Sequence, residues 1–95
     1  MSFTKLEYRV WRLADELNDR DEILDLKHYL TMADYRLRVN AEGLGIDPLT
    51  ISTEMNWTGE LECRFTIKAP APEEALVMAW SLAVARIGLR TERVT

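Results

Sequence analysis

The sequences LTISTEMN, at residues 49–56, and ELECRFTIK, at residues 60–68, decide the fold that we expect for this chain. Apolar and polar residues alternate along both, and a period of two is typical of strands with one buried face. In the second stretch the apolar face consists of Leu61, Cys63, Phe65 and Ile67. Three residues, Trp57-Thr58-Gly59, separate the two stretches, so the sequence predicts a β-hairpin.

A three-residue loop gives the best register for this hairpin. It pairs Met55 with Leu61 and keeps the apolar side chains of both strands on one face. It also puts Gly59 at the third loop position, where the turn requires a positive φ. Trp57 then lies at the tip of the hairpin, where it either folds back onto the core or serves as an anchor for a partner.

A C-terminal helix is predicted over residues 72–87, directly after the hairpin. Pro72 is a favoured first helical residue, and the acidic residues Glu73 and Glu74 suit the positive end of the helix dipole. One apolar face of this helix consists of Leu76, Ala79, Trp80, Ala83 and Ile87. The opposite face also carries Val77 and Met78. A helix that is apolar most of the way round is buried on more than one side, so we expect the N-terminal helices or another chain to cover it.

The N-terminal half predicts two further helices. Apolar residues recur every three or four positions over residues 3–17, which favours a helix there. The alternative is a strand over residues 4–10, where side chains also alternate. A second helix begins near Asp19 or Asp21 and continues beyond Leu37, which stays on its apolar stripe.

Residues 35–41 alternate as well, so a third strand is the alternative for that part of the second helix. We favour the helix, because the sequence AEGLG at residues 41–45 resembles a helix C-terminus. The sequence therefore predicts one α+β domain over residues 1–95 in the order ααββα. It consists of two N-terminal helices, a β-hairpin and a C-terminal helix, with a three-stranded antiparallel sheet if residues 35–41 form a strand. We expect the tail, residues 91–95, to be frayed or ordered by a partner.

Composition excludes several classes of protein. Of the 95 residues, 47% are hydrophobic and 29% are charged, which is ordinary for a globular domain and argues against wholesale disorder. A net charge of −4 argues against a general nucleic-acid or anionic-membrane binder. The single cysteine, Cys63, excludes an internal disulfide and suits a reducing compartment.

Location and origin can also be inferred from the sequence. The longest apolar run, residues 75–85, is too short to span a bilayer, and the N-terminus lacks the apolar core of a signal peptide. We therefore expect a cytoplasmic protein. Nine arginines against three lysines indicate a GC-rich genome, of bacterial or phage type.

Candidate catalytic and metal-binding residues are few. His28, the one histidine, follows Asp25 by three residues, and such a pair resembles the base half of a hydrolytic triad. No serine or cysteine lies in a nucleophile turn, however, and one His with one Cys are too few ligands for a zinc site. Six acids lie between residues 15 and 25, but their spacing matches no calcium loop. We therefore predict no catalytic residue, no metal and no cofactor.

A two-stranded sheet is marginal alone, and its open edge must be covered or paired with a second copy. Together with the apolar back of the last helix, this predicts a non-enzymatic protein–protein interaction module that forms a homodimer. Its partner is another protein or a second copy of itself. The partner-binding residues that we predict are Trp57, Thr58, Val77 and Met78.

A small-ligand or nucleic-acid binding protein is the alternative hypothesis. Tyr29, Tyr35, Arg36 and Arg38 are the side chains that would contact a ring or a phosphate in that case. Ion pairs with the many acidic residues explain these arginines more simply, and the negative net charge disfavours nucleic acid.

Overall fold

A four-stranded antiparallel sheet with two helices forms the fold in the computed structural model, which describes residues 3–12, 22–85 and 87–95, with the backbone alone over residues 22–25. The elements in chain order are β1 (Thr4–Trp11), α1 (Glu22–Gly43), η2 (Pro48–Thr50), β2 (Ser52–Trp57), β3 (Glu62–Ala69), α2 (Glu73–Val84) and β4 (Arg90–Arg93). The strands lie in the order β2-β3-β1-β4, and each pairs with its neighbours in the antiparallel sense.

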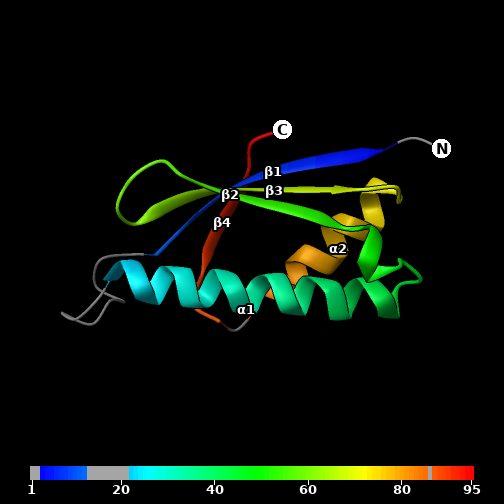
Figure 1. Ribbon diagram of the computed structural model, residues 1–95, viewed down its shortest axis with the longest axis horizontal. Helices are drawn as coiled ribbons and strands as arrows, with labels where there is room; N and C mark the ends of the chain where they lie inside the picture. The colour runs from blue at the N-terminus through cyan, green and yellow to red at the C-terminus, as the bar shows by residue number, and fades with distance from the viewer. Residues whose placement is uncertain (1–2, 13–21, 86) are drawn as a thin grey trace.

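Both helices lie against the same face of the sheet (Figure 1). The element order βαββαβ is that of the split βαβ, or ferredoxin-like, arrangement. The core fills the space between the two layers, because alternate residues of the central strands point toward the helices. The largest fully buried side chains include Trp80, Phe65, Leu6, Leu26, Leu30, Leu37, Ile67, Leu76 and Val10.

The predicted order ααββα and the two- or three-stranded sheet are wrong. The first predicted helix is instead strand β1, the alternative for residues 4–10, with Leu6, Tyr8 and Val10 pointing into the core. β1 is a central strand, paired with β3 on one side and β4 on the other. Pairing with distant strands overrides a local helical pattern, and for that reason the stripe of apolar residues misled the prediction. The predicted continuation of that helix over residues 13–17 lies outside the described residues.

The C-terminal tail, predicted to be frayed or ordered by a partner, is largely strand β4. Its backbone pairs with residues Tyr8 to Trp11 of β1, and the Val94 amide donates to the Glu7 carbonyl at 2.9 Å. The Trp80 indole Nε1 donates to the Thr91 hydroxyl at 3.1 Å, which ties β4 to α2. β4 therefore completes the second side of β1 within the chain itself.

The remaining helix predictions agree better with the structure. α1 is helical through residues 35–41, as favoured, so the alternative third strand there is wrong. Pro72 is the N-cap of α2 instead of its first residue, and the helix ends at Val84. Trp80 of α2 stacks against Tyr8 and Phe65, with ring centroids 5.2 Å and 4.8 Å apart, which confirms the prediction that it belongs to the core.

The hairpin exists, but its register differs from the prediction. Met55 lies opposite Phe65 instead of Leu61, and Gly59 does not adopt a positive φ. A wider loop is closed by the Thr58 amide, which donates to the Glu62 carbonyl at 3.1 Å, and by the Thr58 hydroxyl, which donates to the Glu62 carboxylate at 2.9 Å. The shift is an even number of residues, so the predicted inward face of β3 is retained.

No helix within the described residues is long and apolar enough to cross a membrane.

Candidate partner-binding site

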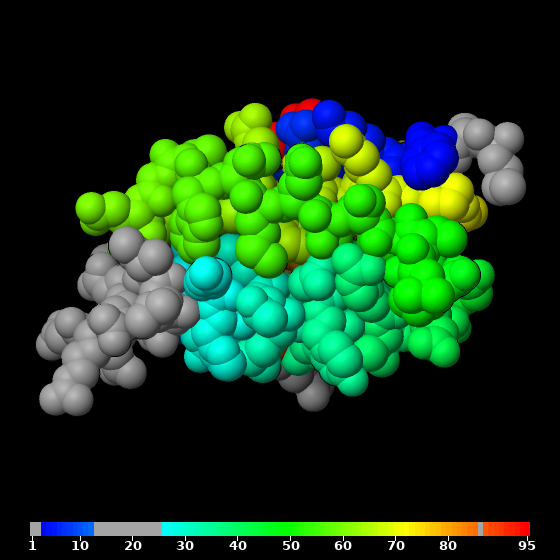
Figure 2. Space-filling model, in the orientation of Figure 1, coloured from blue at the N-terminus to red at the C-terminus, as the bar shows by residue number. Residues whose placement is uncertain are grey.

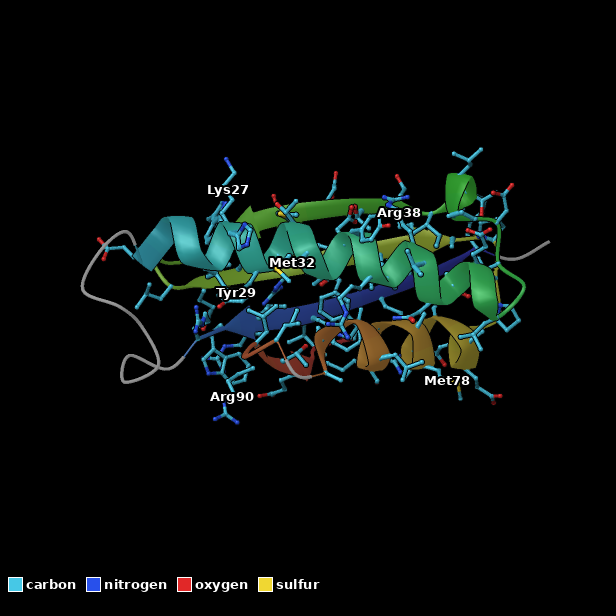
Figure 3. The ribbon with its side chains drawn as sticks, turned by 90° about the horizontal axis from the view of Figure 1, so that it is seen from below. Lys27, Tyr29, Met32, Arg38, Met78 and Arg90 are labelled. Carbon is cyan, nitrogen blue, oxygen red and sulfur yellow. The ribbon has the colours of Figure 1, made fainter. Side chains whose placement is uncertain are left out.

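An open hollow of about 500 Å³ lies between the outer side of α2 and strand β4. Its lining residues are Glu73, Glu74, Val77, Met78, Ser81 and Arg93. Met78 lies on the side of α2 away from α1 (Figure 3). The hollow therefore includes two of the four predicted partner-binding residues, Val77 and Met78.

Helical geometry explains why these two side chains face outward. The residues of α2 that point to the sheet are Leu76, Ala79, Trp80 and Ala83. Val77 and Met78 follow Leu76 directly, and each step rotates the side chain by about 100° around the helix. Val77 thus remains partly buried against the core, whereas Met78 is 53% exposed. The pair gives the hollow an apolar floor.

Charged groups surround that floor. The Arg93 guanidinium forms an ion pair with the Glu73 carboxylate and also donates to the Thr95 carbonyl. Glu74 lies in the first turn of α2, and none of the described residues forms an ion pair with it. The hollow thus combines an apolar floor with a rim carboxylate, Glu74, that no described residue pairs with.

The same charges act on Tyr8, which lies opposite Arg93 in the sheet. Burial raises the pKa of the Tyr8 hydroxyl above its ordinary value, Arg93 opposes that rise in pKa, and Glu73 adds to it. The neutral phenol is therefore the form that the folded state favours.

The hairpin tip forms a second hollow, of about 560 Å³, lined by Trp57, Thr58, Gly59 and Glu60. Trp57 is 41% exposed, so it does not fold back fully onto the core. The tip and the start of α2 lie toward opposite ends of the molecule (Figure 1). The structure therefore separates the four predicted residues into two surfaces.

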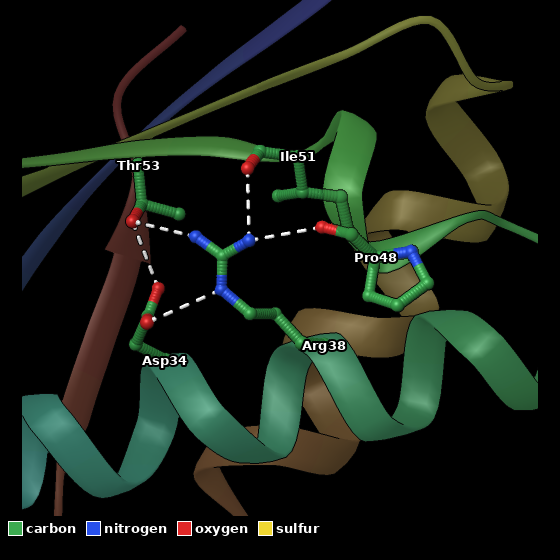
Figure 4. Close-up of polar contacts among 5 residues, drawn as sticks. All are labelled: Asp34, Arg38, Pro48, Ile51 and Thr53. Atoms are coloured by element: carbon green, nitrogen blue, oxygen red, sulfur yellow. Dashed lines mark hydrogen bonds and ion pairs between the residues drawn. The ribbon is translucent and has the colours of Figure 1, made fainter.

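Arg38, assigned to a ligand site in the alternative hypothesis, has a structural role (Figure 4). Its guanidinium donates to the carbonyls of Pro48 and Ile51 at 3.0 Å and 2.8 Å, to the Thr53 hydroxyl at 3.3 Å and to the Asp34 carboxylate at 3.3 Å. Four of the five guanidinium N–H donors are thereby used. The side chain fastens α1 to the start of β2 and has little capacity left for a phosphate.

The other residues of that hypothesis do not gather around Arg38. Arg36 donates to the Leu82 carbonyl at 3.1 Å, which joins α1 to α2. Tyr35 is 70% exposed, and the Tyr29 ring lies 4.3 Å below the Arg12 guanidinium. Neither the α2 hollow nor the hollow at the hairpin tip is lined by these residues.

The face of the sheet without helices is covered by ion pairs. Arg9 contacts Glu62 at 2.6 Å and Glu92 at 4.0 Å, and Arg64 contacts Glu7 at 3.8 Å. Arg9 also lies over the Trp11 ring, 4.3 Å from its centroid. Hydrogen bonds from Arg9 and from Thr58 lower the pKa of the Glu62 carboxyl. Acidic partners thus offset the basic side chains of this face, which does not suit a polyanion.

Other candidate groups give no site. Cys63 is fully buried, as predicted, and burial raises the pKa of its thiol, which disfavours the nucleophilic thiolate. His28 is exposed on α1. Within the described part of the chain, no three His, Cys, Asp or Glu residues are grouped to hold a metal ion. Of the six acids between residues 15 and 25, those at residues 15–21 lie outside the described residues, and the side chains of Glu22 and Asp25 are not described.

Sequence reasoning missed Arg93, which lines the α2 hollow, and Tyr8, which lies opposite Arg93 in the sheet. The sequence predicts a frayed or partner-ordered tail at Arg93, and a helix at Tyr8 with a strand as the alternative. The alternation of Thr4, Leu6, Tyr8 and Val10 was the signal for β1. No comparable alternation marks β4, whose four residues include three charged side chains.

Comparison of the chain with protein-family models, with curated proteins and with solved structures gives no significant match. Fold and hollow together define an α+β sandwich with helices on one sheet face and an apolar, charge-rimmed surface beside its last strand. Folds of this kind carry many unrelated functions, so the site, and not the fold, must support any functional assignment.

Proposed function

We propose that this protein is a non-enzymatic protein–protein interaction module that acts as a homodimer and binds a further partner through the outer side of α2. One observation carries the partner-binding part: the exposed Met78 and half-buried Val77 form the apolar floor of a hollow with a charged rim. A flexible, exposed methionine is suited to contact with varied apolar side chains. The buried, unreactive Cys63 thiol fits a cytoplasmic setting, which is part of the same proposal.

The rim indicates which partner segments suit the hollow. Glu73 is already neutralised by Arg93, whereas Glu74 has no ion-pair partner among the described residues. A segment with an apolar side chain for the floor and a Lys or Arg beside it would complement both features. Apolar contact supplies affinity in such sites, and the charge supplies orientation.

Selection of peptides from a random phage-displayed library on the immobilised protein tests the proposal. We expect the selected peptides to share an aliphatic or aromatic residue next to a basic one. A synthetic peptide of that sequence should bind the protein in solution, as measured by fluorescence polarisation. Met78→Ala should weaken its binding about tenfold, because truncation of a central anchor removes about 1–2 kcal/mol.

Tyr35→Ala is the matched control, since Tyr35 is at least as exposed as Met78 but lies on α1. That variant should bind the peptide as the unaltered protein does. If the selected peptides bind Met78→Ala and the unaltered protein equally, the α2 hollow is not the binding surface. Selection of no sequence-specific peptide at all would also contradict the proposal.

A further inference from the structure

The two edges of the sheet differ in how well they resist pairing with another strand. β4 is four residues long and carries Arg90, Glu92 and Arg93, and short charged edges discourage pairing. β2 is six residues long, and Glu54 is its one charged residue. No strand within the described residues pairs with the outer edge of β2. Figure 2 shows that edge on the face toward the viewer, above α1.

The direction of the free backbone groups on β2 follows from the hairpin. Thr58 and Glu62 are directly opposite and hydrogen-bonded. Residues of an antiparallel pair alternate between hydrogen-bonded and non-hydrogen-bonded positions. Hence β2 forms backbone hydrogen bonds to β3 through Ser52, Glu54 and Asn56. The backbone N–H and C=O groups of the intervening residues point outward, away from β3. These intervening residues are Thr53, Met55 and Trp57.

A second copy of the chain can pair with that edge in a self-complementary register. Directly opposite residues of two antiparallel strands lie on the same face, which restricts the registers allowed around a twofold axis. The register centred on Met55 sets Met55 opposite Met55 and Thr53 opposite Trp57. It forms roughly six backbone hydrogen bonds, because all outward groups of both strands are used. Glu54 then lies opposite Asn56.

The neighbouring registers are less favourable for pairing of the two strands. A shift in one direction sets Glu54 opposite Glu54, and like charges directly opposite each other are destabilising. A shift in the other direction sets Asn56 opposite Asn56 and leaves Thr53 without a partner. Charge and hydrogen bonding therefore select the same arrangement.

Two charged side chains of α1, Lys27 and Asp34, lie beside β2. Lys27 lies beside the end of β2 at its arrowhead, which is the Trp57 end (Figure 3). Asp34 lies near the other end, where its carboxylate accepts a hydrogen bond from the Thr53 hydroxyl at 2.8 Å. Pairing of Thr53 with Trp57 of a second copy brings Lys27 of each copy toward Asp34 of the other, whose carboxylate already pairs with Arg38 at 3.3 Å. The pairing also covers Trp57, which is 41% exposed in the single chain.

From these observations we infer that the protein forms a homodimer by antiparallel pairing of β2 with β2 of a second copy, centred on Met55. This gives one sheet across both copies. The inference rests on the proposed function, since it names the surface that makes the interaction module dimeric. The α2 hollow lies beside β4, at the other edge of the sheet, and stays open in such a dimer.

Disulfide cross-linking tests the register with side chains that the fold leaves exposed. Glu54 and Asn56 are exposed, so Glu54→Cys and Asn56→Cys should both fold, and native Cys63 is buried. Residues opposite each other in a non-hydrogen-bonded pair have Cα atoms about 4.5 Å apart, within the range that a disulfide spans. An oxidised mixture of the two variants should give a covalent dimer. Each variant alone should give little, because diagonal neighbours are about 7–8 Å apart.

Sedimentation equilibrium of the unaltered protein should show a species of twice the 11.0 kDa of one chain. A monomer at all concentrations up to hundreds of micromolar would overturn the inference. Cross-linking of Glu54→Cys with itself, or equal yields in all three samples, would overturn the register centred on Met55. Peptide binding by the α2 hollow is measured on the same samples, so a monomer that still binds the selected peptide contradicts the dimer and leaves the partner-binding site in place.

Discussion

Two arginines join a helix to an edge of the sheet, and they do so to different extents. Arg38 of α1 contacts three acceptors at the start of β2 and a fourth, Asp34, on its own helix, and its side chain is 31% exposed. Arg93 of β4 contacts Glu73 of α2 and the Thr95 carbonyl, and its side chain is 40% exposed. On the α1–β2 side of the molecule the hydrogen-bonding groups are satisfied by Arg38. The α2–β4 side, with Arg93, retains a hollow with an apolar floor. An arginine can therefore contribute to a binding surface only where its guanidinium N–H groups do not already donate to groups of the same chain.

The largest effect is expected from Arg38→Ala. The change removes charge-assisted hydrogen bonds to the carbonyls of Pro48 and Ile51, of which the Pro48 carbonyl keeps the Ile51 amide as a donor. Such losses cost about 2–3 kcal/mol in the free energy of unfolding. Urea unfolding followed by circular dichroism measures this, as a lower midpoint with an unchanged slope.

Arg36→Ala is the control for Arg38. Among the described residues, Arg36 makes one hydrogen bond, to the Leu82 carbonyl, in an exposed position. Its removal should cost less than about 1 kcal/mol. Equal losses of unfolding free energy in the two variants would mean that the Arg38 contacts stabilise the fold no more than the single Arg36 bond does. The contrast between the Arg38 side and the Arg93 side of the molecule would then be wrong.

A smaller effect is expected from Arg93→Ala. Exposed ion pairs contribute about 0–1 kcal/mol, so the unfolding midpoint should hardly change. The change releases Glu73, which makes the rim of the hollow more negative. The selected basic peptide should therefore bind more tightly at low salt, with a gain that disappears as salt is added. Tighter binding that persists at high salt would exclude this electrostatic explanation.

Local patterns predicted some elements well because those elements depend on neighbours in the chain. The inward face of β3, the burial of Cys63 and the helix through residues 35–41 all follow from alternation or three-four spacing. The hairpin register was not predictable in this way. It depends on the Thr58–Glu62 contacts and on Arg9 of β1, which holds the Glu62 carboxylate from another strand.

The remaining errors concern strands that exist only through distant pairing. Leu6 and Val10 fit a helix and a strand equally well, and the partners that decide, β3 and β4, lie more than fifty residues away in the chain. β4 has no apolar alternation of its own. Val77 and Met78 at the α2 hollow were predictable from the excess of apolar residues on that helix. Arg93, which forms the other wall, was not predictable, because its place follows from β4.

The smallest effect is expected in the alkaline stability of the α2–β4 flank. Burial raises the pKa of Tyr8 in the folded state above its ordinary value of 10.0. As the pH rises beyond about 10, the unfolded chain loses this proton first, so the unfolded state binds fewer protons than the folded state. Stability from Tyr8 is therefore fully present below that pH and is lost as the pH rises toward the folded pKa.

Tyr8→Phe keeps a ring to stack on Trp80 and removes the titrating hydroxyl. The unfolding midpoint of this variant should fall less steeply above pH of about 10 than that of the unaltered protein. Arg93→Ala should raise the pKa of Tyr8 further, and Glu73→Gln should lower it, since these two groups act on the phenol in opposite directions. Tyrosinate absorbance, with Tyr8→Phe subtracted to remove the signals of Tyr29 and Tyr35, follows the titration. An identical pKa of Tyr8 in the Arg93→Ala and Glu73→Gln variants would show that the charged rim of the hollow does not act electrostatically on the core beneath it. The contrast with the α1–β2 side, where Arg38 lies, would then rest on hydrogen bonding alone.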